Sequence, residues 1–502
     1  MPDLQDKYIS LLPTGVCSLQ AFLREAGFDA IVANFSGWST ADIRQQLSDL
    51  KPDIVGISQW THNRHASMDL AALARIVSPG CTIILGGAHA TFSATDILCP
   101  GSPVDCIVLG EGEETLLEIV RSCQCGLEWQ DIPGIACLRD GSVVVTSPRS
   151  RLKNLDQLPI ATRYLEHSIA VDLQLQSEFI ITTRGCPSEC HFCSSPEFWK
   201  RRVRFRSPEN IVNEMIYSRA RYGLIYFSIR DDTFTVDRDR TIEFCRLLID
   251  RRLHVLWNCQ SRVNTLDEEL LVWMKRAGCE CVQLGVESGS QRILTQIGKS
   301  ITPDQVELAA GLIRKVGINL SIYLITDIPG ETEGDVRQTI ELVRRIRPDD
   351  GYVSPLAYFP GTRLFEEAVA AGSVERDLFK NRPEIALFAA DKLGKNTRRI
   401  LRCLANGASE DAQRFRQQKR LLGYCYATNV LAGEFYRQCG DRGAAEREFS
   451  EIVGREPENP WGWYLLGELY SEMGRFAKSA ECYRAVCEIV PAHVPSRHAL
   501  KR

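Results

Sequence analysis

TRGCPSECHFC, residues Thr183 to Cys193, is the stretch that decides how this 502-residue chain is organised, because it carries three cysteines in a C-x3-C-x2-C pattern. Cys186, Cys190 and Cys193 follow the apolar run 179–181 on one short loop, so their thiolates can bind one face of an inorganic cluster. A [4Fe-4S] cluster takes one ligand per iron, and three thiolates leave one iron open. A zinc knuckle is the alternative, with His191 as fourth ligand, but its ring has poor reach between two cysteines. The pattern favours a catalytic iron-sulfur site.

The cysteine spacing and the aromatic Phe192 before the last cysteine resemble the signature of the radical S-adenosylmethionine (SAM) superfamily. In that superfamily the amino and carboxylate groups of SAM bind the open iron. The resemblance implies one-electron cleavage of SAM to methionine and a 5′-deoxyadenosyl radical. It makes Cys186, Cys190 and Cys193 the catalytic metal ligands and places Phe192 near the adenine.

Composition excludes several classes of protein. Apolar residues make up 44% and charged residues 25% of the chain, which is typical of globular domains, and the length indicates about three of them. A net charge of −4 gives no general attraction to nucleic acid or anionic membranes. No apolar run approaches the roughly 18 residues of a membrane span, and the polar stretch from Met1 to Ser10 lacks a signal core. We expect a cytoplasmic protein that binds no nucleic acid and whose nineteen cysteines are reduced.

Residues 1–128 alternate helix and strand in the manner of a Rossmann-like, doubly wound sheet. The expected strands are 29–33, 53–58, 82–85 and 106–109, and the expected helices are 19–26, 40–50, 70–77 and one from 115. Ligands of such sheets bind at the carboxyl ends of the strands. The loops 58–63, 86–91 and 110–114 should therefore point at one place.

Four segments in these loops, DIVGIS, THNR, GGAHAT and GEGE, resemble the cobalamin-binding domain that precedes the radical SAM domain in cobalamin-dependent radical SAM enzymes. The resemblance implies cobalamin contacts from Ser58, Thr61, Asn63, Gly86, Gly87, His89, Gly110 and Glu111. His89 is expected at the corrin or its tail. The D-x-H-x-x-G motif that supplies a lower cobalt ligand is missing. The lower face of cobalt would then be open or water-bound, or approached by His62 or His65, which are otherwise ordinary polar loop residues.

Residues 129–176 are predicted to form a connector with a β hairpin around Asp140-Gly141. Residues 177–375 repeat strand then helix, as in a partial (β/α) barrel. The expected strands after the cysteine loop are 224–229, 255–259, 281–286, 319–325 and 351–356. Polar residues at the carboxyl ends of barrel strands gather at one mouth, and the cysteine loop also follows the carboxyl end of a strand.

The resemblance gives SAM contacts to these strand ends, because SAM needs an anion for its ammonium, a cation for its carboxylate and acceptors for its hydroxyls. Asp231 or Asp232 would accept from the ammonium and Arg262 would hold the carboxylate. Glu287, with the adjacent Ser288, would contact the ribose or amino group. The structural alternatives are helix capping for the two aspartates and a surface ion pair for Arg262.

Residues 376–502 are predicted to be helical. The pattern L-x-G-E-x-Y-x3-G at 431–440 recurs at 465–474, and Phe449 matches Tyr483 at the same shift. The period resembles that of tetratricopeptide repeats, here over about 430–492. Two repeats are fewer than usually stand alone, so they should dock on preceding helices or on another surface. Contact with a partner protein and capping of the barrel are equally good interpretations.

Together the resemblances imply a cobalamin-dependent radical SAM enzyme with a [4Fe-4S] cluster, SAM and cobalamin as cofactors, an external electron donor, and a small-molecule or peptide substrate. A C-methyltransferase is favoured, in which the radical takes hydrogen from an unactivated carbon and methylcobalamin gives the methyl group. A cyclase or rearrangement enzyme of the tetrapyrrole type shares every motif. An interaction scaffold with an inactive site is the alternative from another class, and the intact cysteine triad counts against it.

Overall fold

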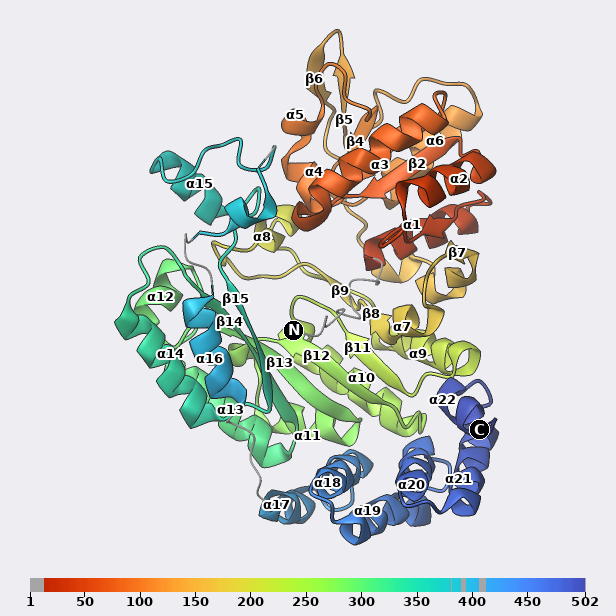
Figure 1. Ribbon diagram of the computed structural model, residues 1–502, viewed down its shortest axis with the longest axis vertical. Helices are drawn as coiled ribbons and strands as arrows, with labels where there is room; N and C mark the ends of the chain where they lie inside the picture. Colours follow the sequence, from red (N-terminus) through yellow and green to blue (C-terminus); the bar gives the residue numbers. More distant parts are fainter. Residues whose placement is uncertain (1–12, 381, 390–393, 406–411, 502) are drawn as a thin grey trace. The chain divides into compact units, whose positions relative to one another are not determined.

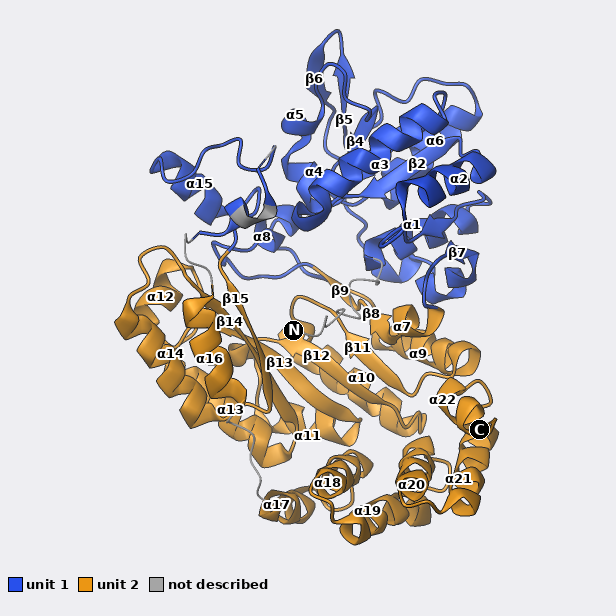
Figure 2. Cartoon of the chain, in the orientation of Figure 1, with its two compact units in different colours: residues 1–172, 185–204, 357–389 blue, residues 173–184, 205–356, 390–502 orange. Residues whose placement is uncertain are grey.

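The computed structural model describes residues 13–380, 382–389, 394–405 and 412–501. The predicted polar stretch from Met1 to Ser10 lies outside them. The chain forms two compact units, coloured separately in Figure 2: unit 1 holds residues 1–172, 185–204 and 357–389, and unit 2 holds 173–184, 205–356 and 390–502. The cysteine loop belongs to unit 1 and the strands expected for the barrel belong to unit 2. The domain boundaries predicted above cut the chain elsewhere and stay predictions.

Unit 1 contains a five-stranded sheet in the order β2-β3-β4-β5-β6 (Figure 1). Its strands are β2 Ile54–Ser58, β3 Thr82–Gly86, β4 Cys106–Val108, β5 Ile135–Arg139 and β6 Ser142–Val145. The first three are parallel, and the predicted hairpin adds β5 and β6 antiparallel to them, so it extends this sheet. The predicted strand 29–33 is reduced to β1 Val32–Ala33, which pairs with β7 Ser168–Ile169 and not with this sheet.

Helices cover both faces of the unit 1 sheet. Side chains alternate between faces along a strand, so Ile83 and Leu85 pack with residues of α3, whereas Ile84 packs with Ile119 of α6. Ser39 caps α2 by accepting a hydrogen bond from the Asp42 amide. The helices of the unit are α1 Thr14–Glu25, α2 Thr40–Leu50, α3 Arg64–Val77, α4 Ala88–Phe92, α5 Ala94–Ile97, α6 Glu113–Gln124, α8 Ser195–Trp199 and α15 Arg363–Ala370. This is the expected Rossmann-like arrangement.

Unit 2 contains a six-stranded, wholly parallel sheet in the order β15-β14-β13-β12-β11-β8, which confirms the predicted partial barrel. The strands are β8 Phe179–Ile180, β11 Tyr226–Ile229, β12 Leu256–Ser261, β13 Cys279–Glu287, β14 Asn319–Thr326 and β15 Asp350–Pro355. The connecting helices are α7 Leu173–Glu178, α9 Pro208–Tyr222, α10 Arg238–Asp250, α11 Glu268–Arg276, α12 Gln291–Gln296, α13 Pro303–Val316 and α14 Glu333–Ile346.

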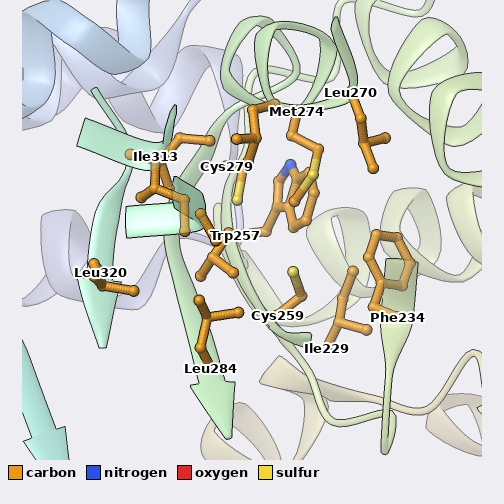
Figure 3. Close-up of a cluster of buried hydrophobic side chains, with 14 of the residues drawn as sticks. Ile229, Phe234, Trp257, Cys259, Leu270, Met274, Cys279, Leu284, Ile313 and Leu320 are labelled. Atoms are coloured by element: carbon orange, nitrogen blue, oxygen red, sulfur yellow. The ribbon is translucent and has the colours of Figure 1, made fainter. Parts of the chain in front are cut away.

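The main core of unit 2 lies between one face of this sheet and its helices (Figure 3). Phe234, Phe244 and Trp257 are fully buried and meet edge to face, with ring centroids 5.5–5.6 Å apart. The indole nitrogen of Trp257 donates to the Ala277 carbonyl oxygen at 2.9 Å, so its one polar atom is satisfied inside the core. The other face of the sheet carries polar side chains, described below.

The C-terminal residues of unit 2 are helical, as expected, and the two predicted repeats correspond to α18 with α19 and α20 with α21. The helices are α16 Lys395–Ala405, α17 Gln413–Leu422, α18 Tyr426–Gln438, α19 Arg442–Arg455, α20 Pro460–Glu472, α21 Phe476–Ile489 and α22 Val494–Ala499. A Cβ on Gly433 would come within 2.2 Å of the Phe449 ring, and one on Gly467 within 2.8 Å of the Tyr483 ring. Both glycines therefore allow the two helices of a repeat to approach closely, and the second repeat reproduces the contact of the first.

These repeats dock on the amino-terminal ends of the barrel strands. Tyr426 donates from its hydroxyl to the Val255 carbonyl oxygen, immediately before β12, at 2.7 Å. Lys275 at the end of α11 is fully buried, and its Nζ donates to the carbonyl oxygens of Gly317 at 2.6 Å and Ala427 at 3.4 Å. Burial lowers the pKa of this lysine. The capping alternative is confirmed for these contacts, and a partner protein stays a prediction.

Candidate active site and cofactor-binding residues

The cysteine loop in unit 1 begins with a turn that only glycine fits. Gly185 has a φ of 106°, and a Cβ there would lie 2.0 Å from the Arg202 carbonyl oxygen. Cys186 and Cys190 are buried and Cys193 is half-buried. Each thiolate of a four-iron cluster binds a different iron, so the three sulfur atoms need not meet at one point. In the part of the chain that the structure describes, no three Cys, His, Asp or Glu side chains gather around a single-ion site.

The three loops at the carboxyl ends of β2, β3 and β4 are hydrogen-bonded to one another, as expected from the predicted sheet. The Gln59 amide donates to the Gly86 carbonyl oxygen at 2.8 Å, and Thr61 Oγ1 lies 3.1 Å from His89 Nδ1. The Gly110 amide donates to Thr91 Oγ1 at 3.1 Å. These bonds join the DIVGIS–THNR, GGAHAT and GEGE segments into one surface made largely of backbone.

The tightest backbone contact within this surface is at Gly87. Its φ is 99°, and a Cβ there would stand 2.7 Å from the Gln59 carbonyl oxygen. Asn63 closes the first loop on itself: its Nδ2 donates to the Ser58 carbonyl oxygen at 3.1 Å, and its Oδ1 accepts from the Trp60 amide at 2.7 Å. Asn63 and Gly87 therefore shape the surface through its backbone.

His89 is only 3% exposed, beside the Phe379 ring at 5.8 Å. Burial, together with Arg64 and His65, lowers the pKa of His89 to about 4. Arg64 is 2% exposed and donates to the carbonyl oxygens of Thr61 at 2.8 Å, Phe379 at 3.1 Å and Arg382 at 2.5 Å. His89 is thus a neutral, buried residue of the loop framework. The predicted contact of His89 with the corrin or its tail stays a prediction.

Glu111 of the GEGE segment accepts a hydrogen bond from Arg204 Nη1 at 2.7 Å, and both side chains are largely buried. Arg204 also donates to the Leu152 carbonyl oxygen at 2.7 Å and lies over the Trp199 ring at 5.6 Å. The carboxylate therefore ties this loop to the residues that follow the cysteine loop. The predicted cobalamin contact of Glu111 stays a prediction, and the ion pair gives the residue a positioning role.

Residues 357–389 link the cysteine loop to the surface of the unit 1 sheet. The Leu364 amide donates to the His191 carbonyl oxygen, between the second and third cysteines, at 2.9 Å. Gly361 has a φ of 74°, and a Cβ there would lie 2.3 Å from the Phe92 ring at the end of the GGAHAT helix α4. Sequence reasoning missed this link and Arg64, because both depend on contacts between residues far apart in the chain.

Asp231, which follows β11 in unit 2, accepts hydrogen bonds from backbone amides. Its Oδ1 accepts from the amides of Thr182 at 2.6 Å and Thr183 at 3.0 Å, and its Oδ2 accepts from the Thr182 hydroxyl. Arg240 donates to the same hydroxyl at 2.8 Å, and burial raises the pKa of Asp231. The N-cap of α10 is Asp237, so Asp231 does not cap this helix. Asp231 therefore holds the residues that lead to the cysteine loop, and the predicted contact of Asp231 or Asp232 with the SAM ammonium stays a prediction.

Glu287 ends β13 with a φ of 66° and pairs with Lys299 Nζ at 2.9 Å, and the two side chains are 9% and 6% exposed. This buried carboxylate thus has a cationic partner, a lysine that sequence reasoning missed. Ser288 is fully buried and lies 3.2 Å from the Thr339 hydroxyl of α14. Its side chain is therefore part of the strand–helix packing, and its predicted contact with SAM stays a prediction.

Arg262 and Asp232 keep the positions that the barrel predicted. Arg262 directly follows β12 and is 9% exposed, so a buried cation lies at that strand end, unlike the expected alternative of a surface ion pair. Asp232 follows β11 and is exposed, and Phe192 is half-buried in the cysteine loop. Their predicted SAM contacts stay predictions.

The polar face of the unit 2 sheet, which is the side opposite the main core, carries side chains that sequence reasoning missed. Ser228 donates to Asn258 Oδ1 at 2.8 Å, Asn258 donates to the Tyr226 hydroxyl at 2.6 Å, and that hydroxyl donates to Glu280 Oε1 at 2.9 Å. Burial raises the pKa of both Tyr226 and Glu280. The signal was present as a polar residue at every second position of β11 and β12.

Nearer the carboxyl ends of the strands, the same face carries an aromatic pair. Tyr323 donates to Gln283 Oε1 at 2.9 Å and stacks on Tyr352, with ring centroids 5.2 Å apart and planes inclined by 15°. Arg230 lies over the Phe179 ring at 4.9 Å. This end of the face offers flat aromatic surface and hydrogen-bonding groups together.

Comparison with known proteins identifies the domains. A model described as "Radical SAM superfamily" matches residues 180–343, one described as "B12 binding domain" matches 10–120, and one described as "Tetratricopeptide repeat" matches 462–493. A protein of Pyrococcus horikoshii described as an uncharacterized methyltransferase is 31% identical over 366 residues, which cover 71% of this chain and 78% of the relative. The chain belongs to the B12-binding radical SAM family.

One further relative and two solved structures are also similar to this chain. The anaerobic magnesium-protoporphyrin IX monomethyl ester cyclase of Rubrivivax gelatinosus is 31% identical over 366 residues, covering 71% of this chain and 66% of the cyclase. Among solved structures, the radical SAM methyltransferase TsrM of Kitasatospora setae, with cobalamin and a [4Fe-4S] cluster bound, has a TM-score of 0.63 at 18% identity, covering 73% of each chain. OxsB with aqua-cobalamin has a TM-score of 0.65 at 15% identity, covering all of this chain and 83% of OxsB. The two structures show the fold.

Family membership makes this chain a cobalamin-dependent radical SAM enzyme whose cofactors are a [4Fe-4S] cluster, SAM and cobalamin. The residues present fit these groups: three thiols on one glycine-turned loop, and a surface of backbone at the end of the unit 1 sheet. Within the described ranges, no helix is long and apolar enough to span a bilayer.

Proposed function

We propose that this enzyme is a C-methyltransferase that acts on an unactivated carbon of a small molecule or peptide. The cofactors would supply a 5′-deoxyadenosyl radical to remove hydrogen and a methyl group carried by cobalamin. The observation that carries the proposal is the pairing of a radical SAM and a B12 binding domain in a chain that is 31% identical to a relative described as a methyltransferase.

In this proposal the protein binds and aligns. Cys186, Cys190 and Cys193 hold the cluster, Arg262 takes the SAM carboxylate, and Asp232 and Glu287 take its ammonium or ribose, with Phe192 near the adenine. The loops at Ser58, Thr61, Asn63, Gly86, Gly87 and Gly110 hold cobalamin through their backbone. Asp231, Glu111, His89 and Ser288 position these groups without touching the reacting atoms. The aromatic pair Tyr323 and Tyr352, with Gln283, would orient the substrate.

The test is anaerobic reconstitution with iron, sulfide and hydroxocobalamin, followed by SAM carrying a deuterated methyl group, a reductant and candidate substrates. We expect bound cobalamin in the optical spectrum and both 5′-deoxyadenosine and S-adenosylhomocysteine among the products, with the label in the substrate. The Cys190→Ala variant is the control and should form no deoxyadenosine. Absence of bound cobalamin in the wild type would contradict the proposal.

The second candidate is a radical cyclase, because the Rubrivivax gelatinosus cyclase is equally identical, at 31% over 366 residues. The same experiment separates the two. A cyclase consumes no methyl group, so deoxyadenosine without S-adenosylhomocysteine and without labelled product would favour it. An external electron donor is required in both cases and is replaced here by the chemical reductant.

A further inference from the structure

A basic groove lies between α14 and α16 in unit 2, and the proposed reaction does not use it. The groove is a hollow of about 650 Å³ lined by Arg344 and Arg347 at the end of α14, Arg399 and Arg402 of α16, and Cys403. Both helices bury apolar side chains in the main core, including Leu342 and Ile400, so they hold the groove on the helical side of the sheet (Figure 1).

The four arginines come from two helices and the residue that ends one of them. Arg344 lies in the last turn of α14 and Arg347 directly follows that helix with a φ of 43°, whereas Arg399 and Arg402 are three residues apart on one face of α16. The helices run in the same direction: Arg399 meets Glu333 at the start of α14, and Cys403 Sγ lies 3.9 Å from the Ile340 carbonyl oxygen further along. Two guanidinium pairs therefore border one groove from opposite sides.

The adjacent Arg345 pairs with an acidic residue, whereas only one of the four groove arginines does so among the described residues. Arg345 pairs with Glu307 at 2.8 Å, and Arg399 grips both oxygens of Glu333 at 2.6 and 2.9 Å. The side chains of Arg344, Arg347 and Arg402 make no hydrogen bond or ion pair with any residue in the described ranges. They are also not needed to end α14, because Arg314 donates to the carbonyl oxygens of Ile346 and Arg347. Among the described residues, a single carboxylate therefore pairs with this group of four guanidinium groups.

Like charges gathered at one place repel, and an anion relieves that repulsion. Guanidinium groups match phosphate oxygens in forked, bidentate pairs, and 650 Å³ lies within the range of small-molecule pockets, about 300–1,000 Å³. We infer that the groove between α14 and α16 binds a small molecule bearing a diphosphate or comparable phosphate group. Arg347 leads into the start of β15, so the site lies toward the strand ends opposite to Arg262 and Glu287.

The test is calorimetric titration of the full-length protein with inorganic pyrophosphate at constant ionic strength. We expect one saturable site per chain, weakened by about tenfold or more in the double variant Arg344→Gln/Arg402→Gln, because each substitution removes a charge-assisted hydrogen bond to phosphate. The matched control is Arg345→Gln, an adjacent arginine paired with Glu307, which should bind pyrophosphate like the wild type. Raising the salt concentration should weaken binding in the wild type more than in the double variant.

A second readout uses the thiol in the groove. Bound pyrophosphate should slow alkylation of Cys403 by iodoacetamide, mapped by peptide mass spectrometry, and leave the exposed Cys439 unaffected. No saturable binding, equal loss in Arg345→Gln, or unchanged alkylation of Cys403 would overturn the inference. So would binding of a glutamate-rich peptide in the absence of pyrophosphate binding, since the groove would then be a protein-docking surface.

Discussion

The two sheets of this enzyme present polar groups at the carboxyl ends of their parallel strands in different ways. In unit 1 the loops bond mainly to one another, through Gln59 to Gly86 and Gly110 to Thr91. In unit 2 the strand ends are fixed by buried side chains, as in the Glu287–Lys299 pair and the bonds of Asp231 to Thr182. The backbone surface of unit 1 requires that its loops approach one another closely, whereas a buried charge in unit 2 requires its partner. Different kinds of substitution should therefore disrupt the two sheets.

The largest effect should come from the cysteine loop, which unit 1 carries beside its backbone surface. Replacing Cys190 by alanine removes one iron ligand, and we expect cluster iron and deoxyadenosine formation to fall to background. Cobalamin binding should persist, because the loops at Ser58, Gly86 and Gly110 do not depend on the cluster. Iron analysis and the cobalamin spectrum of the same sample check both halves. Loss of cobalamin as well would mean that the two sites of unit 1 are not separable.

The buried Glu287–Lys299 ion pair of unit 2 should be the structural feature whose disruption lowers the stability most. Lys299→Met leaves the Glu287 carboxylate buried without its cation, which costs about 3–5 kcal/mol in the free energy of unfolding. The double variant Glu287→Gln/Lys299→Met removes both charges and should recover much of that stability, measured by chemical denaturation. If Glu287 also contacts SAM, SAM cleavage should stay low in the double variant. Full recovery of both would restrict the pair to a structural role.

In unit 1 the corresponding change is Gly87→Ala. A Cβ at this position meets the Gln59 carbonyl oxygen at 2.7 Å in a backbone conformation that favours glycine, so we expect a loss of about 2–4 kcal/mol and weaker cobalamin retention. Gly56→Ala is the matched control, because Gly56 lies on β2 with no atom within 4 Å of an added Cβ. Equal effects of both substitutions on cobalamin would contradict the role of close approach.

The smallest effect concerns pH. Because the pKa of His89 is about 4 in the folded protein and about 6.5 when unfolded, the unfolded chain binds the extra proton between these values. Stability should therefore be present above pH 6.5 and decrease as the pH falls toward 4, by about 1–2 kcal/mol at pH 5. His493 in unit 2, whose pKa burial also lowers to about 4, should add a similar dependence there. Hydrogen exchange of residues 86–92, with His89→Gln as control, separates the two contributions.

Periodicity and local motifs were sufficient to predict most strands and the cysteine loop. The apolar runs at 53–58 and 281–286 lie close to β2 and β13, because a strand buried in a parallel sheet needs continuous apolar residues. Long-range partners were beyond reach. Nothing near Glu287 indicates that Lys299, twelve residues later, returns to it. Nor does anything near Asp231 indicate that its carboxylate accepts from the backbone amides of Thr182 and Thr183.

The sequence also did not show that the hairpin in the predicted connector extends the unit 1 sheet. The hairpin at Asp140-Gly141 was predicted from its turn residues, which adopt positive φ values of 48° and 77°. Its pairing with β4 could not be predicted, since an antiparallel partner leaves no separate mark on an apolar strand. The basic groove was equally hidden, because its two pairs of arginines lie on or beside separate helices with the whole of β15 and α15 between them in the chain.

Lys275 makes the C-terminal repeats a permanent part of the protein. Its side chain is fully buried, and its Nζ donates to the Gly317 and Ala427 carbonyl oxygens, so it joins the end of α11 to α18. An expression fragment that ends before residue 412 would lose the Ala427 partner and uncover the apolar surface that α18 covers, and we expect it to be insoluble.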